Sequence, residues 1–135
     1  MIVMAVGYVK KSYMERDFGH FDQKFWMPLY SKPDVIQYDY AQGLYVQSKG
    51  QRFVVFTQSR DIFHGLRLAR CTAYKDGEDF QIALYNTDGD RDIINTNEYG
   101  NLLSWPKELF SCDYRGCLDL LKLQSELRKA AKENG

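Results

Sequence analysis

The run Phe-Val-Val-Phe at positions 53–56 constrains the fold most, because four consecutive apolar residues predict a strand that is covered on both faces. The run ends at Thr57, Gln58 and Ser59, and the residues that follow have the apolar spacing of a helix. Ser59 is a suitable N-cap for this helix, and Asp61 places a negative charge in its first turn. The sequence therefore predicts a buried strand, a polar turn and a helix, which together form a building unit of α/β proteins.

Further elements are predicted on both sides of this unit. Between Ser12 and Pro33 the pattern favours at most a short helix, because glycine and proline interrupt it, and the role of residues 1–33 stays open. A C-terminal amphipathic helix is expected from Asp113 onward. The expected fold is α/β or α+β, a single domain over residues 1–135 with a small mixed sheet, flanking helices and a β-hairpin. Strands are predicted at residues 2–9, 34–38, 44–47, 53–56, 80–85 and 91–95, the last two joined as a hairpin through residues 86–90.

Composition and charge limit the functions that the chain can have. At 135 residues the chain is long enough for one domain with a hydrophobic core. Eighteen basic residues balance eighteen acidic ones, so no overall field attracts nucleic acid or an anionic membrane surface. No run approaches the roughly 18 apolar residues that span a bilayer. Three cysteines without a C-x-x-C pair fit a reducing compartment, so we expect free thiols and a cytoplasmic protein.

Three segments together resemble one family of ATPases. The stretch FVVFTQSRDIFHGLR, which begins at Phe53, is similar to the Thr-His-Ser strand end of AAA-type (ABC-class) ATPases close to the overcoming-lysogenization-defect (OLD) family. Residues 34–51 (DVIQYDYAQGLYVQSKGQ) resemble the family's Walker B strand and its sequel, which carries an acidic pair, a proline, a Leu-His-Pro and a glutamine. Residues 99–110 (YGNLLSWPKELF) resemble its Trp-Pro-x-x-Phe-Phe ending. The resemblance covers residues 34–124.

The resemblance implies a nucleotide site that is degenerate. Its candidate residues are Asp39, Thr57, Gln58 and Ser59, and the ligand that they would hold is ATP with Mg²⁺. Asp39 takes the place of the family's metal-binding acid, but Tyr40 replaces the catalytic glutamate and Gln58 replaces the histidine that reaches the γ-phosphate. The chain has no G-x-x-x-x-G-K-[ST] loop to hold phosphates. We therefore predict no catalytic residue, and a domain that acts by protein binding, as a regulator or inhibitor of a defence-type ATPase, or by binding a second copy of itself.

Other interpretations stay open at this point. The chain could supply Asp39 and Gln58 in trans to a partner that carries Walker A, or it could be an unrelated, aromatic-rich interaction module. The ATPase interpretation requires these two residues to lie on adjacent parallel strands. Ser59 could be an ordinary N-cap. The segment Asp88-Gly89-Asp90 could hold Mg²⁺, but Asp-Gly is a strong turn signal, and no zinc-type spacing is present, so we predict no metal site.

Overall fold

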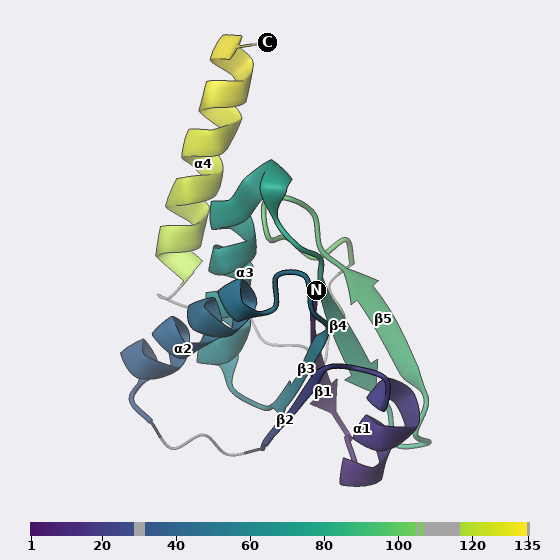
Figure 1. The fold of residues 1–135 in the computed structure, drawn as a ribbon. Coiled ribbons are helices and arrows are strands. Elements are labelled where there is room, and N and C mark those ends of the chain that lie inside the picture. Colours follow the sequence, from purple (N-terminus) through teal and green to yellow (C-terminus); the bar gives the residue numbers. More distant parts are fainter. Residues whose placement is uncertain (29–31, 105, 107–116, 135) are drawn as a thin grey trace.

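The computed structural model describes residues 1–28, 32–104, 106 and 117–134. Five strands form one mixed sheet in the order β2-β3-β1-β4-β5, in which the first four are parallel and β5 runs antiparallel to β4 (Figure 1). This architecture confirms the predicted α/β class with flanking helices and a hairpin. The elements are β1 (Ile2–Gly7), α1 (Lys11–Phe18), β2 (Gln23–Met27), α2 (Asp34–Gln47), β3 (Phe53–Thr57), α3 (Arg60–Ala73), a short 3₁₀ turn (Tyr74–Asp76), β4 (Phe80–Tyr85), β5 (Arg91–Asn95) and α4 (Cys117–Asn134).

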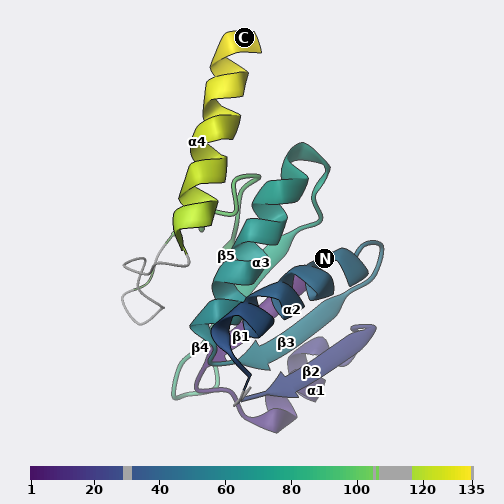
Figure 2. The same cartoon turned by 90° about the vertical axis from the view of Figure 1, so that its left-hand side faces the viewer.

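Helices cover both faces of the sheet (Figure 2). The chain moves along the sheet in one direction from β1 to β2, and in the opposite direction from β2 to β3 and from β3 to β4. If all three crossovers have the same hand, α1 must lie on one face and the α2–α3 pair on the other, as observed. Helix α4 contacts α3 and extends beyond the body of the molecule (Figure 1).

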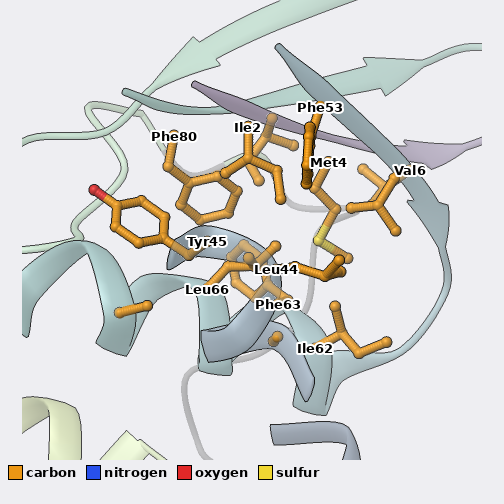
Figure 3. Close-up of a cluster of buried hydrophobic side chains, with 14 of the residues drawn as sticks. Ile2, Met4, Val6, Leu44, Tyr45, Phe53, Ile62, Phe63, Leu66 and Phe80 are labelled. Carbon is orange, nitrogen blue, oxygen red and sulfur yellow. The ribbon is translucent and has the colours of Figure 1, made fainter. Parts of the chain in front are cut away.

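The larger hydrophobic core lies between the sheet and the α2–α3 pair (Figure 3). Residues of the central strands alternate between the two faces, as the pleat of a strand requires. Met4 and Val55 point into the larger core, whereas Ala5 and Val54 point into the smaller core beneath α1. All five residues of β3 are buried. The prediction of a strand covered on both faces is therefore confirmed.

The strands predicted at residues 34–38 and 44–47 are wrong, because both segments lie in the single helix α2. The β-branched residues Val35 and Ile36 favoured a strand, but both side chains are exposed, so they have no sheet to pack against. The buried residues of this helix are spaced three and one positions apart, as on one helical face: Ala41, Leu44 and Tyr45.

Close packing of α2 against α3 explains why these residues form a helix. A Cβ atom added at Gly65 of α3 would lie 2.6 Å from the carbonyl oxygen of Tyr38 and 2.7 Å from the Cβ atom of Ala41. The glycine therefore lets the two helix backbones approach closely, and the apolar stripe of α2 is buried at this crossing. This contact joins residues far apart in the sequence, so the local pattern of residues 34–47 did not indicate it.

Strand β2 lies in the region whose role the sequence left open. Phe25 and Trp26 belong to the segment 12–33, for which the sequence favoured at most a short helix, but the helix of this region is α1, which ends at Phe18. In the strand the two side chains point to opposite faces. Phe25 contacts the ring of Phe53, with 5.6 Å between centroids, and Trp26 contacts Phe56, with 4.3 Å between centroids. Residues 2–27 therefore supply two of the five strands of the sheet.

The remaining predictions concern the carboxy-terminal half. The hairpin is confirmed, and its turn is closed by Asn86, whose side-chain oxygen accepts hydrogen bonds from the backbone N–H groups of Asp88 and Asp90. The C-terminal helix is confirmed over Cys117–Asn134, while residues 113–116 and Trp105 of the Trp-Pro segment lie outside the described residues. Within the described part of the chain, no helix is long and apolar enough to cross a membrane.

Candidate functional site

The turn at residues 57–59 joins the carboxyl end of β3 to the start of α3. The Oγ1 atom of buried Thr57 accepts a hydrogen bond from the backbone N–H of Ser59, at 3.1 Å. The Ser59 hydroxyl accepts from the backbone N–H of Ile62, at 3.2 Å, which confirms the predicted N-cap of α3. The same hydroxyl donates to the side-chain oxygen of Gln37 on α2. The turn therefore ties together β3 and the first turns of two helices.

Gln58 lies where the connections of two adjacent strands diverge. The chain leaves β1 toward α1 on one face of the sheet and leaves β3 toward α3 on the other face. In α/β proteins such a switch point opens a crevice at the carboxyl ends of the strands, and ligands bind there. Here the Nε2 atom of Gln58 donates a hydrogen bond to the carbonyl oxygen of Gly7, at the carboxyl end of β1, at 3.0 Å. We call residues 7–10 and 57–59 together the strand-end site.

The loop after β1 is folded back onto β4. The backbone N–H of Tyr8 donates to the carbonyl oxygen of Tyr85, at 3.1 Å, and the N–H of Val9 donates to that of Gly7, at 3.0 Å. Gly7 has a φ of +88°, and an added Cβ atom would lie 2.5 Å from the carbonyl oxygen of Tyr85. A phosphate-binding nest needs successive N–H groups that point at the anion. The first two N–H groups of this loop are already used inside the chain.

The side chains of Thr57, Gln58 and Ser59 can form hydrogen bonds but cannot act as proton carriers. Thr57, Gln58 and Ser59 offer hydroxyl and amide groups, which do not titrate near neutral pH. Two exposed lysines lie at the start of α1: Lys10, within the strand-end site, and Lys11, next to it. Residues 57–59 therefore offer hydrogen bonding and no general acid or base, and the two lysines add charge attraction.

Asp39 does not belong to the strand-end site as the sequence suggested. It was expected on a strand beside the strand of Gln58, and that prediction is wrong, because Asp39 is exposed on α2. Strand β3 pairs with β1 on one side and with β2 on the other, so neither of its neighbours contains Asp39. Helix α2 is bonded to the turn through Gln37, in the first turn of the helix. Reading the segment after Pro33 as a helix would have placed Gln37 at this edge of the sheet.

A second polar cluster lies between α1 and the hairpin. Asp17 accepts hydrogen bonds from Arg16, at 2.8 Å, and from the hydroxyl of Tyr85, at 2.7 Å, and it forms an ion pair with Arg91, at 3.2 Å. The hydrogen bond from Arg16 is the main reason why the pKa of Asp17 lies below its ordinary value. Burial raises the pKa of Tyr85. All of these partners belong to the chain itself and occupy both oxygens of the Asp17 carboxylate. The cluster therefore stabilises the packing of α1 against the sheet.

A polar hollow of about 410 Å³ opens at the other end of the sheet, near the amino ends of the strands. It is lined in part by His20, Asp22, Arg52 and Glu78. Its two carboxylates hold backbone groups, since Asp22 accepts from the N–H of Arg52, at 2.7 Å, and Glu78 accepts from the N–H of Gly50, at 3.1 Å. The hollow is therefore a well-bonded junction of loops.

Comparison with known proteins identifies no relative of this chain: no family model, no curated protein and no solved structure matches it. Among the residues that the structure describes, no group of three or more histidine, cysteine, aspartate or glutamate side chains could hold a metal ion. Cys71 is buried and free, as expected for one of the three thiols. The function must therefore be argued from the strand-end site and the surface of the molecule.

Proposed function

We propose that this protein is a catalytically degenerate ATPase-like domain that acts by binding another protein, as a regulator or inhibitor of an ATPase. The observation that carries the proposal is the hydrogen bond from Gln58 to the carbonyl oxygen of Gly7. It joins the carboxyl ends of β3 and β1, the position at which an α/β protein would bind a ligand. Because the polar groups of this strand end bond to one another, they stabilise the fold. We therefore infer that the partner protein binds to the outer surface of the domain.

The segment that resembles the family's Walker B strand, residues 34–51, forms helix α2 and the turn after it. Asp39, the counterpart of the family's metal-binding acid, is exposed on this helix, and Tyr40 takes the place of the catalytic glutamate. Both departures favour a domain that does not hydrolyse ATP.

The backbone of the β1 loop supports the same conclusion. Only three residues, Tyr8, Val9 and Lys10, separate β1 from α1. The N–H groups of Tyr8 and Val9 are bonded within the chain, so they are not free to surround a phosphate. Since Asp39 lies on a helix, the alternative in which it joins Gln58 in a composite site in trans has no geometric support. We place the proposed activity in the cytoplasm, because the cysteine pattern fits a reducing compartment.

Isothermal titration calorimetry with Mg-ATP tests the loss of nucleotide binding. We expect no detectable heat of binding for the natural chain or for Gln58→Ala. Gln51→Ala is the matched control, because it removes an exposed glutamine side chain at the opposite end of the sheet. Micromolar binding that disappears in Gln58→Ala and persists in Gln51→Ala would contradict the proposal.

Turnover measurements test the regulatory role. The chain is mixed with a purified Walker A-bearing ATPase of the same cells, and ATP hydrolysis is followed with and without it. We expect a complex in size-exclusion chromatography and a lower rate of hydrolysis. A higher rate would favour a subunit that completes the site in trans. If such ATPases form no complex with the chain, the regulatory role is excluded.

A further inference from the structure

The outer edge of β2 carries backbone groups that the described residues leave unpaired. The N–H of Gln23 donates to the carbonyl oxygen of Arg52, at 3.3 Å, so Gln23 faces β3. Because backbone groups alternate in direction along a parallel ladder, those of Phe25 also face β3, while those of Lys24 and Trp26 face outward. No described residue forms a hydrogen bond to these outward N–H and C=O groups. Figure 2 shows β2 as the outermost strand on this side.

The opposite edge of the sheet is protected. Strand β5 carries charged Arg91 and Asp92, and charged side chains discourage pairing of edge strands. The N–H of Leu103 also donates to the carbonyl oxygen of Asn95, so a following segment covers one end of β5. Strand β2 has one charge, Lys24, and its next three residues are the large apolar residues Phe25, Trp26 and Met27. The edge of β2 is therefore the one that is suited to add a strand.

We propose that this edge pairs with β2 of a second copy of the chain, antiparallel about a two-fold axis that passes through Phe25. In this register Lys24 lies opposite the partner's Trp26, and Trp26 lies opposite the partner's Lys24. Opposed residues whose backbone groups face each other exchange two hydrogen bonds. The two pairs therefore satisfy all of the outward groups of both copies and join the sheets into one.

Other registers satisfy fewer groups. A two-fold axis through Lys24 would set two lysines directly opposite each other, which is destabilising. An axis through Trp26 would set Lys24 opposite Pro28, which has no N–H to donate. Registers centred between residues are excluded, since directly opposed side chains must point to the same face of the sheet. The axis through Phe25 also gives the longest overlap of the two strands.

The side chains along the edge fit this pairing. Lys24 and Trp26 point to the α1 face, where Lys24 pairs with Glu15 of α1, at 3.6 Å. A hollow of about 230 Å³ lies beside the edge on this face, lined by Lys11, Met14, Glu15, Lys24 and Trp26. In the dimer, each Lys24 lies against the ring of the partner's Trp26, a favourable cation–π pair. The hollow of each copy gives room for the side chains of the other copy. On the other face, Phe25 opposes the partner's Phe25, an aromatic cross-strand pair. This inference is independent of whether nucleotide binds.

Light scattering coupled to size-exclusion chromatography tests the dimer. We expect twice the monomer mass of 15.8 kDa for the natural chain at micromolar concentration. Lys24→Pro should elute as a folded monomer, because the N–H that proline removes faces away from β3 and serves only the partner. Lys24→Ala, which keeps that N–H, should remain a dimer, and circular dichroism checks that both variants fold. The proposal would be overturned by a monomeric natural chain, even if its edge binds a different protein. A dimer that survives Lys24→Pro would overturn it as well.

Cysteine cross-linking tests the register. In the proposed dimer the two copies of residue 25 form a pair without hydrogen bonds, about 4.5 Å apart at Cα, within the range of a disulfide. Phe25→Cys should therefore cross-link under mild oxidation. Gln23→Cys should not, because position 23 faces the partner's Met27, and the natural chain gives the background of its own cysteines. A mixture of Gln23→Cys and Met27→Cys chains should cross-link, which serves if Phe25→Cys does not fold. Cross-linking of Gln23→Cys alone would contradict the register.

Discussion

The strand-end site and the edge of β2 belong to neighbouring strands but differ in how their polar groups are used. At the strand-end site, Thr57 accepts a hydrogen bond from Ser59 within the turn, while Gln58 donates to Gly7 and Ser59 donates to Gln37. At the edge of β2, the outward backbone groups of Lys24 and Trp26 have no partner within the described structure. The segment with the strongest functional signal in the sequence is thus bonded within the fold, whereas unpaired backbone groups of the described residues lie on a strand that the sequence did not reveal.

Substitution of Gly7, in the strand-end site, should lower the stability of the fold more than substitution of Asp17 or Ser59. In Gly7→Ala the new Cβ would lie 2.5 Å from the carbonyl oxygen of Tyr85, at a φ of +88° that disfavours alanine. Strain and crowding together should lower the free energy of unfolding by about 3 kcal/mol, as measured by chemical denaturation.

Gly50→Ala separates strain from crowding. Gly50 has a similar φ of +74°, but nothing lies within 4 Å of the added Cβ. This control should lose only about 1 kcal/mol. Equal losses in the two variants would mean that the loop after β1 is not packed against Tyr85, and that the strand-end site is more open than we infer.

Removal of the Asp17 carboxylate should have the second largest effect. Asp17→Asn weakens the contacts that fasten α1 beside the strand-end site, and we expect a loss of about 2 kcal/mol at neutral pH. The pKa of Asp17 is lowered in the folded state, mainly by Arg16, so its stabilisation is present above the ordinary aspartate pKa of about 3.9.

The pH dependence of this difference distinguishes a charge effect from a packing effect. The difference in unfolding free energy between the natural chain and Asp17→Asn should shrink as the pH falls from about 4 through the lowered pKa. Asp88→Asn, at an exposed position in the hairpin turn, is the control and should change stability little at any pH. A difference that stays constant down to the lowest pH would show that the ion pairs do not carry the effect.

The smallest expected effect is the loss of the α3 cap. Ser59→Ala removes the acceptor for the N–H of Ile62 and the donor to Gln37, and should cost about 1 kcal/mol of unfolding free energy. Ser59→Thr keeps a hydroxyl and should retain most of that stability. If Ser59→Ala is as stable as the natural chain, the turn is not held by these bonds, and a role in ligand binding becomes the better explanation.

The sequence predicts those elements whose local pattern agrees with their packing. The apolar run of β3, the cap at Ser59 and the turn at residues 86–90 have local signals that the structure confirms. Their burial or turn geometry follows from neighbouring residues, so no distant contact is needed to infer it. The Thr57–Ser59 part of the strand-end site could therefore be located from the sequence.

Helix α2 and strand β2 could not be predicted in this way. Helix α2 depends on Gly65, which lets it pack on α3, and strand β2 depends on Phe53 and Phe56, which flank its aromatic residues. These partners are distant in the sequence, so β-propensity and helical spacing pointed to the wrong element in each case. Asp39 was misplaced for the same reason.

Hydrogen exchange of the backbone amides tests the central contrast most directly, because one experiment reports on both regions. Exchange is measured in dilute and concentrated protein, and again with Mg-ATP. We predict that the amides of Lys24 and Trp26 become slower to exchange in concentrated protein, while Phe25, whose N–H faces β3, does not change. The amides of Tyr8, Val9 and Ser59 should be unaffected by Mg-ATP. Protection of these three by Mg-ATP, or fast exchange of Lys24 and Trp26 at every concentration, would contradict the account.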